Sequence, residues 1–464
     1  MSLRSSVSRL IGIGLLSSLP LCVVTPTAFA NPAPEPREFL LSNGMKVLLV
    51  EVPKAPVVTV QVWYKVGSRN EVMGRAGLSH MLEHMMFNGT AKYPKGTFSR
   101  LIKKNGGVDN AFTSQDFTAY FENLSADRVE LALELEADRM QGLALNREEF
   151  QREREVVKEE RRLRIDDDPQ AYLVETLYAQ IFLSHPYHWP IIGWMSDLNA
   201  MTLDDLQRHY DTYYSPNNAT LVVVGDIKAE ALLPRIKRLF EPIPRGPAPP
   251  PVVGQEPDQR GERRVILKRE AQLPFVMVGY RAPNFTSDDA YALSVLESVL
   301  SHGKSGRLYR SLIYEQQLGL AVGAEYTLMQ ADPGLFYFYT IVKPGQKVEA
   351  AEEALLKEIQ KIQAQPPSEQ ELQRAKNNVE AAYIFQQDSN FRHAMLLGEA
   401  ETVGAGWRSV GQFVDRIRSV TAKDVQRVAQ KYLIEDGRTV GILLPLPPRT
   451  DEHASAMDGR EASR

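Results

Sequence analysis

Two histidines and a glutamate lie close together in the segment Gly77–Phe87, which reads GLSHMLEHMMF. His80 and His84 are four residues apart, so in a helix both imidazoles project from one face, and Glu83 lies on the same side. Such a pair of imidazoles can bind one Zn²⁺, and a neighbouring carboxylate can take a proton from the water that the metal activates. The pattern H-x-x-E-H therefore supplies two zinc ligands and a general base.

A zinc site of this kind needs a third protein ligand, which we expect on a separate helix. The charged run Glu148–Arg164, EEFQREREVVKEERRLR, is strongly helical, and its Val156 and Val157 are interpreted as the buried stripe. Glu153 and Glu160 are seven residues apart on one face of that helix. Spacing alone does not select the glutamate that faces the metal. The alternative interpretation is that the histidines are structural residues of an apolar helix.

The elements around these residues fall into two parts of similar make-up. The proline-rich segment 242–261 has no apolar periodicity and is typical of an extended linker. Each part begins with a pair of β-branched runs, namely Met45–Val50 and Val57–Tyr64, then Arg264–Leu267 and Phe275–Tyr280. We predict an α+β fold of two homologous sheet-plus-helix domains, residues 31–241 and 262–447, from an ancient duplication. The polar tail 448–464 is predicted to be disordered.

Residues 1–30 have the layout of a secretory signal peptide. Two arginines precede the apolar stretch Leu10–Val24, and Ala28–Ala30 forms a small-x-small cleavage site. Cys22 is the only cysteine and lies inside this segment, so cleavage leaves a chain without disulfides or cysteine ligands. Export is therefore expected. A bacterial periplasm suits the cysteine-free chain, and secretion is the alternative.

Composition excludes several classes of partner. The formal net charge is −4 at pH 7, which gives no reason to expect nucleic acid or an anionic membrane as partner. Basic pairs such as Arg161–Arg162 lie among carboxylates and are interpreted as solvated helix faces. No segment after the signal peptide is long and apolar enough to span a bilayer, so no stable membrane anchor is expected.

The HxxEH segment, the later E-x-x-V-V-x-x-E from Glu153 to Glu160 and the two-part layout resemble the pitrilysin and insulinase family of metallopeptidases. That family includes the mitochondrial processing peptidases, whose subunits the chain resembles as a half-size bacterial member. The resemblance implies a zinc metalloendopeptidase with one Zn²⁺ per chain. It also implies that His80, His84 and Glu160 are the ligands, that Glu83 is the base, and that Glu153 supports the site.

The segment Gly106–Thr113 resembles the glycine turn and edge strand that receive the substrate backbone in this family. By this resemblance the substrate-binding residues are Asn110, Ala111 and Phe112. Backbone pairing there gives affinity with little sequence preference. The implied reaction is hydrolysis of unstructured peptides, in which Glu83 takes a proton from zinc-bound water and passes it to the leaving amine. The segment His185–Gly193 is a further family landmark that we interpret as structural.

The second half departs from the family pattern. Family members that act alone carry there an arginine and a tyrosine that bind substrate and stabilise the oxyanion. In the alignment anchored on Gln317–Gly319 these two positions hold Ile313 and Leu320. A shifted register would instead bring in Arg310, Tyr314 or Tyr326. The resemblance favours a heterodimer, in which a homologous chain without zinc ligands supplies the pair, and a homodimer is the alternative.

Two other functions stay open. A zinc-loaded peptide-binding or assembly subunit would need a partner chain for catalysis. A peptide-capturing chaperone would hold exported chains without cutting them. Neither function requires Glu83, so the intact motif favours the peptidase.

Overall fold

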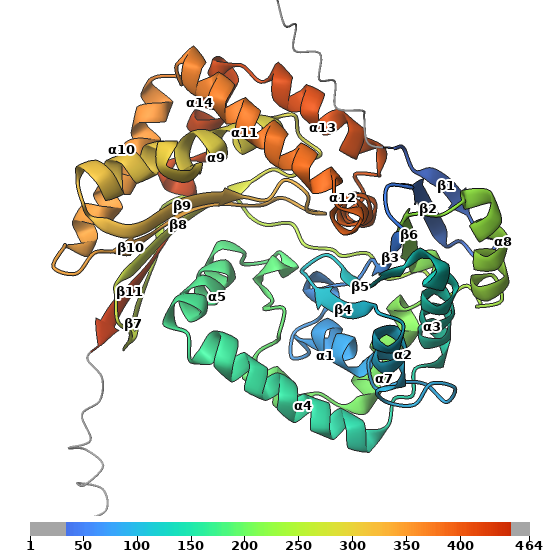
Figure 1. Ribbon diagram of the computed structural model, residues 1–464. Coiled ribbons are helices and arrows are strands. Elements are labelled where there is room, and N and C mark those ends of the chain that lie inside the picture. Colours follow the sequence, from blue (N-terminus) through green and yellow to red (C-terminus); the bar gives the residue numbers. More distant parts are fainter. Residues whose placement is uncertain (1–33, 447–464) are drawn as a thin grey trace, which may run out of the picture. The chain divides into compact units, whose positions relative to one another are not determined.

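Two mixed β-sheets, one in each half of the chain, form the framework of the structure (Figure 1). The computed structural model describes residues 34–446, so the predicted signal peptide 1–30 and the predicted tail 448–464 lie outside the described residues. Both sheets belong to one compact unit that begins at Pro34. Each sheet carries its own helices, which confirms the predicted α+β class.

The sheet of the N-terminal half (Arg37–Phe240) has the strand order β1-β2-β6-β3-β5-β4. Strands β2 and β6 are parallel, and all other neighbouring pairs are antiparallel. The strands are β1 (Arg37–Leu40), β2 (Lys46–Glu51), β3 (Val57–Tyr64), β4 (Val108–Thr113), β5 (Thr118–Ser125) and β6 (Ala219–Gly225). Strand β6 is buried along its whole length. Strand β4 forms one edge of the sheet.

The sheet of the C-terminal half (Arg263–Leu446) repeats this topology in the order β7-β11-β8-β10-β9. Its one parallel pair, β7 with β11, corresponds to β2 with β6. The strands are β7 (Arg263–Glu270), β8 (Phe275–Ala282), β9 (Gly319–Tyr326), β10 (Gly334–Val342) and β11 (Arg438–Leu446). A shared order and sense of strands is what the predicted duplication requires.

The helices of the N-terminal half follow from capped, amphipathic segments. They are α1 (Leu78–Met85), α2 (Thr97–Lys104), α3 (Val129–Gly142), α4 (Arg147–Arg161), α5 (Pro169–Ile181), α6 (Met195–Ala200), α7 (Leu203–Tyr213) and α8 (Ala229–Phe240). Asn146 caps α4 by accepting a hydrogen bond from the Glu149 amide. One π-helical turn, Arg162–Asp166, continues α4 toward α5.

The helices of the C-terminal half occupy equivalent places between equivalent strands. They are α9 (Asp289–Ser301), α10 (Val348–Ala364), α11 (Glu369–Gln387), α12 (Asn390–Thr402), α13 (Arg408–Ser419) and α14 (Ala422–Tyr432). The last helix before the last strand has a Thr-x-x-Asp capping box in both halves, begun by Thr202 for α7 and by Thr421 for α14.

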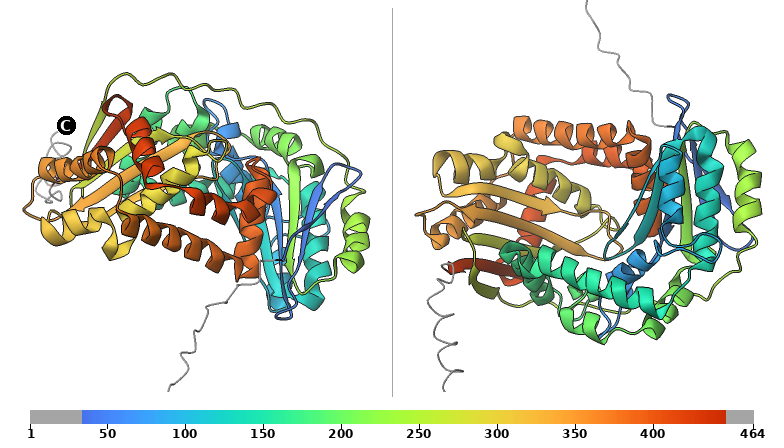
Figure 2. Two further views of the ribbon diagram at one scale, coloured as in Figure 1. Left: turned by 90° about the horizontal axis from the view of Figure 1, so that it is seen from above. Right: turned by 60° about the horizontal axis from the view of Figure 1, so that its bottom comes forward.

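The halves exchange one helix each. Helix α5 lies beside the second sheet (Figure 1), and Figure 2 gives two further views. Apolar residues of α5 pack on the second sheet, and apolar residues of α12 pack on the first, around Trp63. Gly398 of α12 allows this close approach, because a Cβ there would lie 2.2 Å from the Trp63 ring. Each sheet therefore buries its second face under a helix from the other half.

The segment between α8 and β7 contains no helix or strand, as Figure 2 shows. It is nevertheless held by hydrogen bonds at several points, and one carboxylate makes three of them. The carboxylate of Glu256 accepts hydrogen bonds from the amides of Leu183, Ser184 and His185 at 2.8–2.9 Å. No helix among the described residues meets the length and hydropathy that a membrane span requires.

Candidate metal centre

Helix α1 carries the three residues of the HxxEH motif on one face. Its opposite face is fixed in the core by Met81, Leu82 and Met85, all fully buried. The imidazole rings of His80 and His84 lie edge to face with centroids 4.8 Å apart. The helix therefore sets the position of both rings before any metal binds.

The start of α1 is held by the buried carboxyl group of Glu71. Glu71 accepts hydrogen bonds from the amides of Gly77 at 2.6 Å and Ser79 at 2.7 Å, two of the donors that a helix start leaves free. Gly77 has φ +94°, and a Cβ there would lie 2.4 Å from the Ile192 carbonyl oxygen. The chain of the predicted landmark His185–Gly193 thus passes directly over the start of the motif helix.

Helix α4 brings Glu160 to the two histidines. Its Oε2 lies 3.2 Å from His84 Nε2 and 3.7 Å from His80 Nε2. The three ligand atoms all lie within 4.8 Å of one another. Ligand atoms about 2.1 Å from a shared tetrahedral ion would be about 3.4 Å apart. The donor set and its spacing therefore fit one zinc ion.

The protonation of these residues also suits a cation. Burial, and then the neighbouring His84, lowers the pKa of His80 to about 4, so that its ring is neutral near pH 7. Burial acts to lower the pKa of His84 as well, but the hydrogen bond with Glu160 and the nearby carboxylates outweigh it and raise that pKa. Interaction with His84 lowers the pKa of Glu160. An ionised carboxylate thus faces two imidazoles, an arrangement that favours a positive charge between them.

Glu83 lies beside this group without belonging to it. Burial raises the pKa of its carboxyl, and a hydrogen bond from Thr113 offsets part of the rise. The Thr113 hydroxyl donates to Glu83 Oε2 at 2.5 Å. A buried carboxylate with a raised pKa is suited to accept a proton near neutral pH.

Three charged residues surround the ligands. Glu153 Oε2 lies 3.6 Å from His84 Nδ1, and Lys95 donates to Glu153 at 3.2 Å and to Glu149 at 2.5 Å. Arg164, in the π-helical turn, lies 2.9 Å from the second oxygen of Glu160. The Nδ1 of His80, by contrast, has no hydrogen-bond partner among the described residues. Neighbouring groups therefore orient His84 and Glu160 more firmly than His80.

The motif residues open into a cavity of about 1620 Å³. Helix α4 forms one wall and the edge strand β4, with Asn110, Ala111 and Phe112, forms another. Every residue that lines this cavity in the described part of the chain lies between His80 and Ile192. The C-terminal half therefore supplies none of its lining.

Two predictions about α4 are wrong. Val156 was expected to be buried, but it is 51% exposed and lines the cavity, whereas Val157 is fully buried. Arg161 was expected to be solvated, but it is buried and paired with Glu175 at 2.8 Å. One side of α4 faces the cavity, and another side packs against α5, where Arg161 meets Glu175. The pattern of charges in the sequence does not distinguish these two environments.

The three candidates for the arginine and tyrosine pair do not line the cavity. Tyr326 is a core residue whose hydroxyl donates to the Pro283 carbonyl at 2.5 Å. Tyr314 is 76% exposed, and Arg310 lies 3.9 Å from Glu315. None of these three candidates therefore supplies the pair within the cavity.

Three residues around the motif were not singled out from the sequence. Lys95, Thr113 and Arg164 all line the cavity and hydrogen bond or pair with Glu153, Glu83 and Glu160, respectively. Arg164 is four residues after Glu160 in a helical run, so an i, i+4 ion pair is the signal for it. Lys95 and Thr113 are distant in sequence from their partners, and no spacing indicates them.

Comparison with known proteins finds two matching family models and relatives named as proteases. A family model described as "Insulinase (Peptidase family M16)" matches residues 46–193, and one described as "Peptidase M16 inactive domain" matches residues 200–379. A zinc protease named PqqE from Helicobacter pylori is 33% identical over 95% of this chain and 99% of that protein. A probable mitochondrial-processing peptidase subunit beta from Arabidopsis thaliana is 26% identical over 90% of this chain and 80% of that protein.

A solved structure gives the same relationship in three dimensions. The crystal structure of a protease from Helicobacter pylori superposes with a TM-score of 0.86 at 33% identity. The match covers 89% of this chain and 100% of that one.

Proposed function

Because this chain belongs to peptidase family M16, the insulinase family, we propose that it is a zinc-dependent endopeptidase that hydrolyses unstructured peptides. The observation that carries the proposal is the convergence of His80, His84 and Glu160 within one cavity, with Glu83 beside them. One zinc ion per chain would be held by those three side chains. When bound, zinc acts as a Lewis acid that lowers the pKa of water and polarises a carbonyl group.

The chain's own residues perform the remaining steps. Glu83 takes the proton of the attacking water and delivers it to the leaving amine, for which its raised pKa is suited. Glu153 orients His84 through the Nδ1 side of the ring. A peptide that pairs with the edge strand β4 at Asn110–Phe112 would be held by backbone hydrogen bonds next to Glu83.

The test is cleavage of an unstructured peptide mixture by the purified zinc-loaded chain, with the products identified by mass spectrometry. We expect cuts that a chelator abolishes and that added zinc restores. Glu83→Gln should abolish them with zinc still bound. Glu297→Gln is the matched control, because Glu297 lies on α9, the counterpart of α1 in the other half. Cleavage by zinc-loaded Glu83→Gln at the wild-type rate would refute the proposed mechanism.

A partner chain forms the second part of the proposal. Ile313 and Leu320 stand where the family's arginine and tyrosine are expected, and no residue of the described C-terminal half lines the cavity. This supports a catalytic subunit whose homologous, zinc-free partner completes the site, with a homodimer as the alternative. Size-exclusion chromatography combined with peptidase assays tests it: a catalytically competent monomer would contradict both assemblies.

The second candidate function is a zinc-loaded peptide-binding or assembly subunit. The same missing pair favours it, since a chain without an oxyanion group can hold a peptide without cutting it. The zinc-loaded chain would then bind unstructured peptides and leave them intact until a partner is added.

Export is proposed from the predicted signal peptide 1–30, with the periplasm as destination. Fractionation of a Gram-negative host that expresses the full chain, followed by N-terminal sequencing, tests this. A soluble periplasmic product that begins at Asn31 is expected. An uncleaved cytoplasmic product would contradict it.

A further inference from the structure

The hydroxyl of Thr113 makes the hydrogen bond that fixes the Glu83 carboxylate. Among the described residues, Thr113 is the one side chain that hydrogen bonds Glu83, at 2.5 Å from Oε2. Helix α1 fixes the backbone of Glu83, but a glutamate side chain has three rotatable bonds and its carboxylate faces an open cavity. The orientation of the carboxylate therefore depends on this one donor.

Thr113 is itself fixed. It is the last residue of β4, and the turn that follows is held by the amides of Ser68 and Arg69, which donate to the carbonyls of Ser114 and Gln115 at 3.2 and 3.0 Å. Asp116 in the same turn accepts a hydrogen bond from Tyr187 at 2.8 Å. A donor at the end of so constrained a strand can hold its acceptor in one place.

The C-terminal half also reaches this turn. The Ala331 amide donates to Asp116 at 3.2 Å, and Asp332 pairs with Arg69 at 2.8 Å. Asp116 and Arg69 are also paired, at 3.2 Å. The far half of the chain, which lines none of the cavity, thus helps to fix the strand end that carries Thr113.

The position of Thr113 links two functions of one strand. Residues Asn110–Phe112, which immediately precede it, form the free edge against which a peptide would lie. Strand β4, against which the peptide backbone would align, therefore also holds the Glu83 carboxylate. A shift of the carboxylate relative to the peptide by about 1 Å is enough to lower a rate by about a hundredfold.

We propose that Thr113 is a positioning residue, which holds the Glu83 carboxylate in line with a peptide paired to β4; this inference rests on the proposed peptidase function. Thr113 acts through Glu83 and contributes neither to zinc binding nor to peptide affinity. Its hydroxyl is the active part, so serine can replace it and valine cannot.

The test compares Thr113→Val, Thr113→Ser and wild type on one fluorogenic peptide. Thr113→Val should lower kcat by about 10- to 100-fold with KM within about twofold, and Thr113→Ser should restore kcat to within about threefold. Thr59→Val is the matched control, because Thr59 is a buried threonine of the same sheet whose hydroxyl has no partner. It should keep the wild-type kcat. An unchanged kcat in Thr113→Val would overturn the inference.

Two further measurements separate this inference from the proposed function. In the inactive Glu83→Gln background, Thr113→Val should leave the peptide Kd unchanged by fluorescence anisotropy, and a weaker Kd would make Thr113 a binding residue instead. In crystal structures of the zinc-loaded proteins, the Glu83 carboxylate should leave its wild-type position only in Thr113→Val. If wild type cuts no peptide either alone or with its partner chain, the proposed function fails, and the position of this carboxylate still decides the role of Thr113.

Discussion

The two halves of this chain share a scaffold but not a chemistry. Both place a helix between equivalent strands, α1 between β3 and β4 and α9 between β8 and β9. Helix α1 presents His80, Glu83 and His84, whereas the buried face of α9 is apolar, from Leu293 to Leu300. Within residues 34–446 the only group of three ligand atoms within metal-binding reach is the one in the N-terminal half. The same scaffold therefore forms in the second half without such a group.

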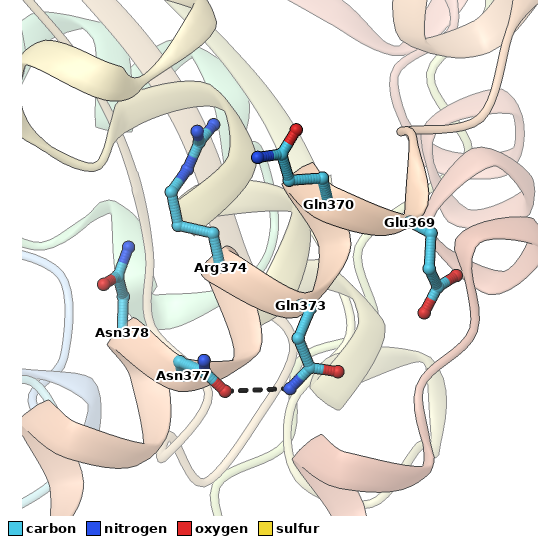
Figure 3. A pocket seen from close by; sticks show the side chains of 6 residues that line it. All are labelled: Glu369, Gln370, Gln373, Arg374, Asn377 and Asn378. Carbon is cyan, nitrogen blue, oxygen red and sulfur yellow. Dashed lines mark hydrogen bonds between the residues drawn. The ribbon is translucent and has the colours of Figure 1, made fainter. Parts of the chain in front are cut away.

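The helices that follow differ in the same way. Helix α4 turns Glu160 toward α1, and its counterpart α11 turns no carboxylate toward α9 in such a group. The hollow on α11 is lined by six polar residues of that helix, and Figure 3 shows Gln373 bonded to Asn377 across one turn, at 2.8 Å. Amides and one guanidinium next to a single carboxylate do not form a site for a divalent cation.

The largest expected effect comes from removing the proposed third ligand, Glu160. Glu160→Gln should lower zinc affinity and peptidase activity by about a thousandfold, since loss of an outer partner alone typically lowers zinc affinity 10- to 100-fold. Its neighbour Glu159 is the matched control: it lines the cavity but lies outside the ligand group. Zinc content by mass spectrometry and peptide cleavage measure both variants. Equal effects of Glu160→Gln and Glu159→Gln would remove Glu160 from the ligand set.

Removal of zinc should destabilise the N-terminal half more than the C-terminal half. At a zinc concentration about a thousand times Kd, binding stabilises the folded protein by about 4 kcal/mol, which a chelator takes away. Hydrogen exchange should then increase in α1 and α4 and stay constant in α9 and α11. The measurement is best made on Glu83→Gln, which cannot digest itself. Equal loss of protection in both halves would contradict a metal site confined to the first.

The carboxyl groups at the starts of α1 and α9 should contribute differently to stability, which is a smaller effect. Glu71→Ala leaves the buried amides of Gly77 and Ser79 without their acceptor, which should cost about 2 kcal/mol and weaken zinc binding through α1. Asp289, at the start of α9, accepts from Arg427, Lys431 and Tyr432. Asp289→Ala should cost about 1 kcal/mol, because two of its partners are half exposed.

Urea unfolding and zinc titration of both variants check this contrast. Zinc affinity should fall for Glu71→Ala alone. A loss of zinc affinity in Asp289→Ala would mean that the two halves are coupled more tightly than their separate cores indicate.

The sequence predicted the scaffold better than the contacts between its parts. Strands such as Val57–Tyr64 are continuous β-branched runs, and the matching ends of the halves indicated equivalent topology. The exchange of α5 and α12 could not be predicted, because an apolar helix face fits either sheet equally well. Arg161 was misassigned for a related reason: its partner Glu175 lies on the next helix, and only the turn between the helices brings the two together.

The residues of the candidate site also divide into those that local sequence spacing predicts and those that depend on contacts between distant segments. Helical periodicity alone put His80, Glu83 and His84 on one face, because they lie within two turns. Glu160 required the resemblance to a known family, since the spacing left Glu153 and Glu160 equivalent. Thr113 is thirty residues from Glu83, and the register of an edge strand against a helix determines their contact. That register depends on the whole sheet and is absent from any short segment.

A pH dependence of opposite sign is also expected in the two halves. Burial acts to raise the pKa of Asp289, but hydrogen bonds from Lys431, Tyr432 and Arg427 outweigh it and lower that pKa to about 2. The unfolded value is about 3.9. The stabilisation by Asp289 is therefore fully present above about pH 4 and is lost as the pH falls through about 2.

Glu71 behaves in the opposite sense. Burial raises its pKa to about 8, although two backbone N–H groups favour the ionised form. The folded protein then holds a proton that the unfolded chain, with a pKa of about 4.3, has released, so stability falls as the pH rises from about 4 to about 8. Urea unfolding between about pH 2 and 8 should lose its acid slope in Asp289→Asn and its neutral slope in Glu71→Gln. If the free energy of unfolding of both variants changes with pH as it does in wild type, neither carboxyl group controls the stability of its helix.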